Sequence, residues 1–188
     1  MRKRNALLSV VTVVALIWRL VLIPEGGLAA VIAGAIGRQP VAFLSEQAFA
    51  MPAVALTTIW WGIGLPMVLF LAALQGVPRE LYEAARVDGA SRWTQFHAIT
   101  LPLISPTVLL TMIITIVGSL QIFAQIAVLT QGGPGMSTTV LVYYLFQQAF
   151  QFHRFGYGST IAILLFVIVA ALTFAQWQLR RKLVFYES

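Results

Sequence analysis

The sequence predicts an all-α fold, a polytopic membrane helical bundle of four transmembrane helices with short interfacial helices. The first observation is composition, because 60% of the 188 residues are apolar and only 10% are charged. An ordinary soluble domain carries about 25% charged residues, so this chain has too few to cover a soluble surface. The second is that the apolar residues gather in stretches of about 20, the length that crosses a bilayer as a helix. Hydrocarbon offers the backbone no hydrogen-bond partners, so each such stretch must be helical.

Four stretches are expected to span the membrane: residues 5–23, 52–74, 103–129 and 157–179. The single charge of the first, Arg19, lies close enough to its end at Pro24 for the side chain to reach the interface. Pro66, between Gly62 and Gly64, is expected to kink the second. A fifth apolar segment, residues 138–152, is too short for a span and suits an interfacial or buried helix.

The positive charges give these spans an orientation. Four spans place both termini on one side, together with the loop between the second and third spans. Nine of the twelve Lys and Arg residues then share that side, in residues 2–4, 75–100 and 180–182. The positive-inside rule makes it the cytoplasmic side. A fifth span would move residues 180–182 outside and break this pattern.

Two segments are expected on the outer side. Residues 24–51 contain a short apolar run, 28–36, which reads as an interfacial helix ended by Gly37. Residues 130–156 contain a glycine-proline turn at 132–135, followed by the short helix of residues 138–152.

The cytoplasmic loop, residues 75–102, concentrates half of the acidic side chains of the chain. Pro78 suits the first turn of a helix, and Glu83 and its neighbour Glu80 suit the positive end of that helix. Gly89 is placed to end the helix in a left-handed conformation. Ser91 can then cap a second short helix. The loop is therefore predicted to form two short helices joined at a glycine.

The first loop helix has the features of a docking surface. Ala84 and Ala85 allow another protein backbone to approach closely, and Glu83 offers that protein an anionic anchor. The alternative is an amphipathic connector that lies on the lipid headgroups, since interfacial helices are common.

The spacing of this loop resembles the EAA loop of binding-protein-dependent ABC importer permeases. The residues that carry the resemblance are Glu83, Ala84, Ala85, Gly89, Ile99, Leu101 and Pro102. Residues 78–82, 87–90 (with Asp88) and 129–134 resemble the carbohydrate-uptake branch, which includes the maltose and glycerol-3-phosphate permease subunits. The resemblance covers roughly residues 10 to 182.

The resemblance implies that the four spans match the last four of a six-span permease. Residues 1–188 would then form a single transmembrane permease domain, shortened at the N-terminus, with both termini cytoplasmic in the inner or plasma membrane of a prokaryote. It also implies a second permease subunit in a heterodimer, two ABC ATPase subunits and an extracytoplasmic solute-binding protein that delivers a sugar. Residues 75–102 would be the coupling loop, in which Glu83 pairs with a basic residue of one ATPase.

The residues present argue against ATP hydrolysis, a metal site or a cofactor in this chain. No G-x-x-x-x-G-K-[ST] phosphate loop is present, and the only lysines are Lys3 and Lys182. Cysteine is absent, and His97 and His153 fall on opposite sides of the membrane in the predicted topology, so neither a metal site nor a cofactor is expected. The scattered basic residues favour membrane lipid over nucleic acid as a partner.

Polar and aromatic residues within the spans suggest a substrate path. At helical spacing, one stripe would follow the second span and another the third. The candidates are Thr58, Trp61, Gly62 and Leu65 in the second span, and Thr115, Ser119 and Ile122 in the third. An aromatic ring beside hydroxyl groups suits a sugar. The alternative is that small and hydroxyl residues pack helix against helix.

Three other functions stay open on the sequence alone. The chain could import a sugar phosphate such as glycerol-3-phosphate, although no cation lies at the centre of a span. It could be a truncated, non-transporting or structural membrane protein. A membrane enzyme would need paired acid and base groups at one depth, which the spans lack.

Overall fold

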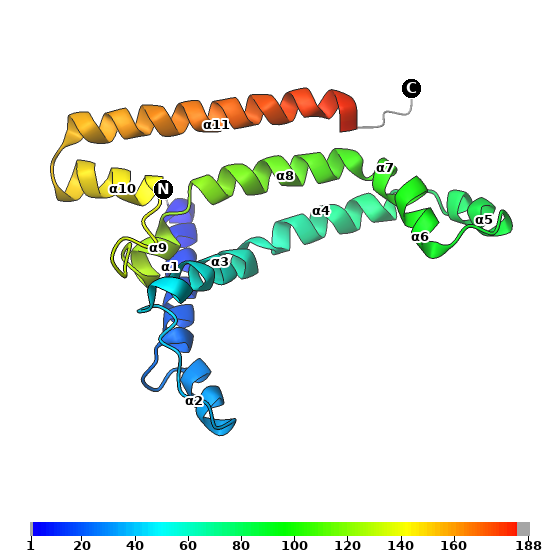
Figure 1. Cartoon of the computed structure of the whole chain (residues 1–188). Helices are drawn as coiled ribbons and strands as arrows, with labels where there is room; N and C mark the ends of the chain where they lie inside the picture. The colour runs from blue at the N-terminus through cyan, green and yellow to red at the C-terminus, as the bar shows by residue number, and fades with distance from the viewer. Residues whose placement is uncertain (1, 184–188) are drawn as a thin grey trace. The chain divides into compact units, whose positions relative to one another are not determined.

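The computed structural model describes residues 2–183, and side chains for residues 12–178. Within these residues every regular element is a helix (Figure 1), which confirms the all-α prediction. The helices in chain order are α1 (Arg2–Leu22), α2 (Leu28–Ala35), α3 (Gln47–Gly62), α4 (Gly64–Gln75), α5 (Arg79–Val87), α6 (Arg92–Gln95), η1 (Phe96–Thr100), α7 (Leu101–Leu103), α8 (Ser105–Leu120), α9 (Ala124–Leu129), α10 (Leu141–Phe146), η2 (Gln147–Gln151) and α11 (Phe155–Leu183). The elements η1 and η2 are single π-helical turns.

Backbone contacts divide the chain into two compact units. The first unit comprises Met1–Trp61 and Leu120–Phe166, and the second comprises Gly62–Ser119 and Val167–Ser188. The second unit contains the 75–102 loop together with the helices that enter and leave it, α4 and α8.

The core of the first unit lies where α3, α9 and α10 meet. Its buried side chains are Val54, Ile126, Leu129 and Tyr143, against which the partly buried Trp18 of α1 packs. Helix α1 also contacts α9. Where folding removes apolar surface of such a cluster from water, each Å² buried stabilises the fold by about 25 cal/mol.

Removal of one methyl group from this core should destabilise the first unit slightly. Ile126 is 1% exposed, so we expect Ile126→Val to lower the free energy of unfolding by about 0.5–1.5 kcal/mol. Thermal unfolding of the purified chain in detergent measures this loss. Ile59→Val on α3 is the matched control, because Ile59 is 64% exposed. Equal losses in the two variants would contradict the assignment of the core.

The predicted spans agree with the helices to different degrees. Among the described residues, α11 alone is long and apolar enough to cross a membrane, over Phe155–Gln178. Two pairs reach that length only if each is counted as one bent span, namely α3 with α4 and Arg92–Leu103 with Ser105–Leu120. In α1 the apolar described part, Thr12–Leu22, is shorter than a span. The side chains of residues 2–4 and 180–182, on which the orientation partly rests, lie outside the described side chains.

The bend in the second predicted span is caused by Pro66. Helix α3 ends at Gly62 and α4 begins at Gly64, four and two residues before Pro66. Proline has no amide hydrogen to donate to the carbonyl of Gly62, and its ring crowds that carbonyl. The kink expected from the sequence is therefore present at Ile63.

The prediction of one continuous helix over residues 103–129 is wrong. Helix α8 ends at Leu120, and α9 begins only at Ala124. Phe123, which precedes α9, lies beside the Tyr143 and Phe146 rings with centroid distances of 6.0 and 5.0 Å. The break lets the apolar residues of α9 enter the core of the first unit, and hydropathy along the sequence does not reveal that preference.

The two segments expected on the outer side form the predicted local structures. Helix α2 is followed by Gly37 at a φ of +71°. The turn at residues 132–135 is fixed by Thr138, whose hydroxyl donates to the Gly133 carbonyl at 2.8 Å and lies 2.7 Å from the Thr130 hydroxyl. Gly132, at a φ of +84°, has no room for a side chain because a Cβ would lie 2.9 Å from the Tyr143 ring. The segment then continues into the short helix α10 and its π-turn η2.

Candidate functional site

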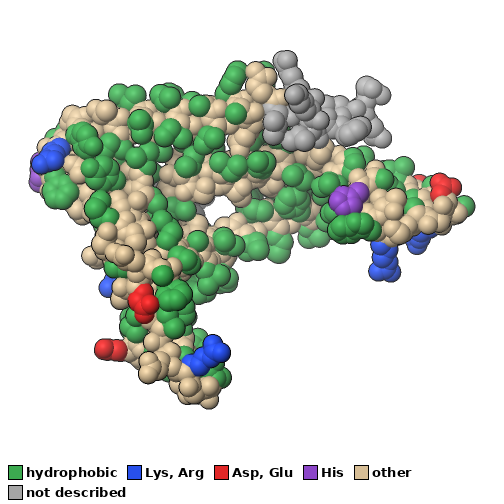
Figure 2. Space-filling model, in the orientation of Figure 1, with side chains coloured by type: hydrophobic (Ala, Val, Ile, Leu, Met, Phe, Trp, Pro, Cys, Tyr) green, Lys and Arg blue, Asp and Glu red, His purple; other side chains and the backbone are tan. Residues whose placement is uncertain are grey.

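Helix α5 presents the acidic, small-residue surface that the sequence predicts. Pro78 precedes its first residue with a φ of −59°, and Glu80 lies in its first turn where a carboxylate interacts favourably with the helix dipole. Glu83 and Ala84 are exposed, and Ala85 is half-buried. Figure 2 shows acidic and basic side chains gathered over the α5 end of the second unit. The helix therefore exposes a carboxylate beside a side chain that leaves room for another protein backbone.

Gly89 ends α5 with a Schellman motif. The Gly89 amide donates to the Arg86 carbonyl at 3.1 Å, and the Ala90 amide donates to the Ala85 carbonyl at 2.9 Å. This pattern requires a left-handed residue, and Gly89 has a φ of +76°. No atom lies within 4 Å of the position that a Cβ would take. The requirement for glycine is therefore a matter of backbone conformation and not of space.

The second loop helix begins where the sequence predicts. The Ser91 hydroxyl accepts a hydrogen bond from the Thr94 amide at 3.2 Å, as an N-cap does. The Gln95 side-chain amide donates to the Ala90 carbonyl at 2.9 Å and holds the turn closed. The helix continues through η1 and α7 to the buried Ile104, where α8 begins.

The motif residues at the end of the loop lie at the entry to α8. Ile99 is half-buried in η1, and Leu101 and Pro102 form α7. The segment Arg92–Leu103 is inclined at 68° to Ser105–Leu120, so the chain turns sharply before it enters the span. Asp88, in the connection between the two loop helices, is exposed.

Exposed apolar side chains add to the loop surface. Val87 is 88% exposed at the end of α5, and Trp93 is 72% exposed on α6. The Trp93 ring stacks on Phe96 with a centroid distance of 5.9 Å, and the edge of His97 meets Trp93 at 4.7 Å. The loop thus combines carboxylates with an apolar, aromatic surface, a composition typical of protein contact sites.

A hydrogen bond that the sequence analysis did not anticipate closes the loop. The Tyr82 hydroxyl on α5 lies 2.8 Å from the Thr100 hydroxyl at the end of η1. The two residues are 18 positions apart, so no local spacing pattern could have identified this pair. Thr100 is buried, with 8% of its surface exposed.

The polar residues proposed for a substrate path are engaged with their own helices. In α3 the Thr58 hydroxyl donates to the Val54 carbonyl at 2.8 Å. In α8 the Thr115 hydroxyl donates to the Thr111 carbonyl at 2.7 Å, and the Ser119 hydroxyl donates to the Ile116 carbonyl at 2.8 Å. These bonds satisfy the donor of each hydroxyl and leave acceptor capacity on its oxygen.

The two helical stripes expected for the path do not persist along their whole lengths. The helix break at Ile63 interrupts the first stripe, because Gly62 ends α3 and Leu65 belongs to α4. The end of α8 at Leu120 interrupts the second, and Ile122 packs against the core of the first unit instead. Trp61, Gly62 and Leu65 remain exposed, as does Ser119.

Comparison with known proteins identifies the family. The profile of the family described as "Binding-protein-dependent transport system inner membrane component" matches residues 4–183. The chain belongs to this family. It is a family of membrane transport permeases and not of enzymes.

Individual proteins that are similar to this chain are also transport permeases. The chain is 43% identical over 124 residues to the putative ABC transporter permease protein ORF1 of Caldicellulosiruptor sp. (strain Rt8B.4), covering 65% of this chain and 89% of that protein. It is 34% identical over 152 residues to the lactose transport system permease protein LacF of Rhizobium radiobacter, covering 79% of this chain and 51% of that protein. The trehalose/maltose transport system permease protein MalF of Thermococcus litoralis is 37% identical over 156 residues, which are 83% of this chain and 52% of that protein. Apart from ORF1, the chain spans about half the length of the curated relatives it matches.

A solved structure shares the fold of this permease. A chain of the bacterial alginate ABC transporter, solved in complex with an alginate pentasaccharide-bound periplasmic protein, superposes with a TM-score of 0.82 at 27% identity. The match covers 92% of this chain and 60% of that chain. The polytopic helical class expected from the sequence is therefore that of ABC transporter permeases.

Among the described residues, no group of three or more His, Cys, Asp or Glu side chains is placed to hold a metal ion. His97 lies on η1 in the 75–102 loop, and His153 lies between η2 and α11 at a φ of +55°.

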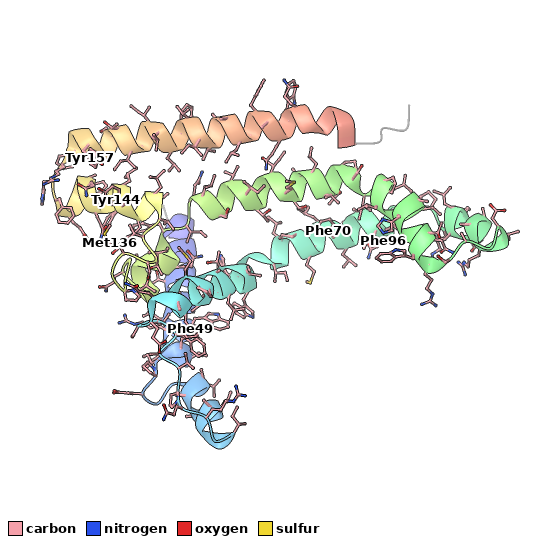
Figure 3. All side chains as sticks on the ribbon, viewed as in Figure 1. Phe49, Phe70, Phe96, Met136, Tyr144 and Tyr157 are labelled. Atoms are coloured by element: carbon pink, nitrogen blue, oxygen red, sulfur yellow. The ribbon has the colours of Figure 1, made fainter. Side chains whose placement is uncertain are left out.

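A tyrosine pair joins α10 to the start of α11 in the first unit. Figure 3 shows Tyr144 and Tyr157 directed toward each other, and their ring centroids are 6.3 Å apart in an edge-on arrangement. A side-chain hydrogen bond with Tyr157 raises the pKa of Tyr144, and desolvation raises it further. The neutral phenol is therefore the form that the folded permease favours at this position.

The Tyr144 pair predicts an alkaline dependence of stability. Because the folded pKa of Tyr144 is raised above 10.0, its contribution to stability is complete below pH 10 and is lost as the pH rises through the raised pKa. In Tyr157→Phe we expect the pKa of Tyr144 to fall toward 10, and the alkaline loss of stability to diminish. Ultraviolet absorbance of tyrosinate during a pH titration measures the first effect. Tyr82→Phe, in the second unit, is the control and should leave the Tyr144 titration unchanged.

Proposed function

We propose that this chain is the transmembrane permease subunit of an ABC importer that carries a sugar or related carbohydrate. The observation that carries the proposal is the exposed Glu83 on helix α5, a helix that ends in a glycine-dependent Schellman motif, in a member of this permease family. The named relatives that support a carbohydrate include permeases of lactose and of trehalose/maltose transport systems.

The proposal assigns a partner to each face of the permease. A second permease subunit completes a heterodimer, and a solute-binding protein delivers sugar on the outer side. Two separate ATPase subunits bind on the cytoplasmic side, where Glu83 pairs with a basic residue of one of them. The structural relative was solved with a sugar-bound periplasmic protein, which supports the outer partner.

The 75–102 loop is the coupling element in this proposal. Its residues Glu83, Ala84, Ala85, Asp88 and Gly89 form the docking part, and Ile99, Leu101 and Pro102 lead into α8. Closure of the ATPases then moves the loop as a rigid body between two states of the transporter. Both termini of the chain are cytoplasmic in this arrangement, as the distribution of Lys and Arg favours.

A neutral sugar is favoured over a sugar phosphate. Residues 52–74, 103–129 and 157–178 contain no Lys or Arg, so these segments offer a phosphate no cationic partner. Burial of an unpaired phosphate in a water-poor path would cost several kcal/mol. Transport of labelled glycerol-3-phosphate at the expense of sugars would contradict this choice.

The proposed substrate path uses Trp61 as its aromatic surface, together with Thr58, Gly62 and Leu65 of the same predicted span and with Thr115, Ser119 and Ile122 of the next. We expect Trp61→Ala to raise the KM for uptake about 2- to 10-fold, because aromatic contacts contribute roughly 0.5–1.5 kcal/mol beyond burial. Binding of the ATPase should not change. Trp60→Ala is the matched control, since Trp60 packs edge-on against Trp18 at 5.6 Å. Normal uptake kinetics in Trp61→Ala would remove Trp61 from the path.

Purification of the complex tests the proposed function. A tagged chain is expressed in its native host, extracted in mild detergent and analysed by mass spectrometry. We expect stoichiometric recovery of an ABC ATPase and a second permease, and ATP-dependent uptake of labelled sugar after reconstitution with the co-encoded binding protein. Recovery of the chain alone would favour the alternative of a non-transporting membrane protein.

A further inference from the structure

The two ends of the 75–102 loop are joined directly by side chains. The Tyr82 hydroxyl, in the middle of α5, lies 2.8 Å from the Thr100 hydroxyl, the last residue of η1. Either hydroxyl can be the donor, and the other then accepts through its oxygen. Thr100 is 8% exposed, and a hydrogen bond is electrostatically stronger in such a low-dielectric position than in water.

The covalent connection between the same two residues is much less direct. From Tyr82 the backbone passes through the end of α5, the left-handed Gly89 and the N-cap at Ser91 before it reaches η1. The turn at Gly89 is held by the Schellman hydrogen bonds and by the bond from the Gln95 side chain to the Ala90 carbonyl. Along the backbone, a force applied to α5 reaches η1 through these bonds, and their distortion would absorb part of it.

Thr100 is well placed to receive such a force. It directly precedes α7, and α7 leads through the buried Ile104 into α8. Tyr82 is held in turn by its own helix, where the Arg86 side chain donates to the Tyr82 carbonyl at 3.3 Å. The hydrogen bond thus links α5, which carries Glu83, to the segment that leads into α8, and this link does not depend on the turn at Gly89.

We propose that Tyr82 and Thr100 are positioning residues whose hydrogen bond makes α5 and the base of α8 move as one body. The coupling role rests on the proposed function, because it takes α5 to be the helix that the ATPase moves. The pair does not bind the ATPase or the substrate. It determines how much of the displacement of α5 reaches α8.

The chain contains no cysteine, which permits a direct distance measurement. Spin labels are attached at Glu80→Cys on α5 and Leu110→Cys on α8, both exposed positions of the second unit, in nanodiscs without any partner. Pulsed electron resonance then measures the distribution of label-to-label distances in the doubly labelled chain that retains Tyr82 and Thr100, and in its Tyr82→Phe, Thr100→Val and Thr100→Ser variants. Loss of one typical hydrogen bond should raise the population of displaced α5 conformers about fivefold in the first two variants. Thr100→Ser retains a hydroxyl and should restore the narrow distribution.

The assembled transporter provides the functional readout. We expect Tyr82→Phe and Thr100→Val to co-purify with the ATPase normally and to import about fivefold less sugar per ATP hydrolysed. The double variant should be no worse than either single variant, because both remove the same bond. Tyr144→Phe removes a tyrosine hydroxyl in the other unit and is the matched control.

Three outcomes would overturn the positioning role. One is an unchanged distance distribution in Tyr82→Phe, and another is additive loss in the double variant. The third is sugar import per ATP at the unsubstituted level in Tyr82→Phe and Thr100→Val. Failure of the proposed function gives a different pair of results. The chain without substitutions would then co-purify with no ATPase, while the distance distributions would still change in the Tyr82 and Thr100 variants.

Discussion

A Glu83→Lys variant should lose ATP-dependent uptake and fail to co-purify with the ATPase, while its helices still insert in the membrane. Glu83 is exposed on α5 and is the proposed partner of a basic residue on the ATPase. Loss of one member of a buried, hydrogen-bonded charge pair costs about 2–5 kcal/mol, and charge reversal adds repulsion. Affinity for the ATPase should therefore fall at least 30-fold, since each 1.4 kcal/mol is a factor of ten.

Two companion variants separate docking from general electrostatics. Glu80→Lys makes the same charge reversal one turn earlier on α5 and should retain most of the uptake. Glu83→Gln keeps the shape and hydrogen-bonding capacity of the side chain without its charge, and should give an intermediate affinity. Pull-down with the purified ATPase measures all three. Equal loss in Glu80→Lys would show that the position of the carboxylate on α5 does not matter, and normal binding in Glu83→Lys would refute its docking role.

Gly89→Val should disrupt the turn between the loop helices and reduce ATPase binding about 5- to 30-fold. A left-handed backbone costs an L-residue roughly 1–2 kcal/mol, and a β-branched residue is a marked outlier there. A Cβ at this position would meet no atom within 4 Å, so we attribute the effect to the backbone conformation. The loop should relieve this strain by abandoning the Schellman hydrogen bonds that orient α5.

A graded series tests this explanation of Gly89. Asparagine tolerates the left-handed region, so Gly89→Asn should bind the ATPase nearly normally, with Gly89→Ala between Asn and Val. Gly118→Val on α8 is the matched control, because Gly118 also has open space around its Cβ position but lies in a regular helix. Equal loss in Gly89→Asn and Gly89→Val would mean that glycine is needed for close approach of the partner.

Local signals made the 75–102 loop predictable before any coordinates. Gly89 and Ser91 each have a preferred place at a helix end, and each is found there, while Pro78 lies one residue before the first turn in which it was expected. The all-helical class followed from composition with equal directness. These features depend on residues close together in the chain, where backbone preferences decide the structure.

The features that the sequence did not predict depend on contacts between residues far apart in the chain. Hydropathy treats residues 124–129 as a continuation of the third span, but their side chains enter a core with Val54 and Tyr143. The expected path stripe lost Ile122 to the same core. Thr100 and Tyr82 meet only because two successive turns bring α5 back to η1, and no spacing rule contains that information.

The π-turn at Phe96–Thr100 also fixes the rotational register of the loop. A π-turn holds one residue more than an α-helical turn, and one residue corresponds to about 100° of rotation around a helix axis. Because the π-turn holds its extra residue within one turn, a deletion here would re-form an ordinary α-helical turn, whereas one further residue added in α-helical geometry would rotate everything before it by that angle. Insertions here should therefore be far less tolerated than substitutions, even though most of its side chains face outward.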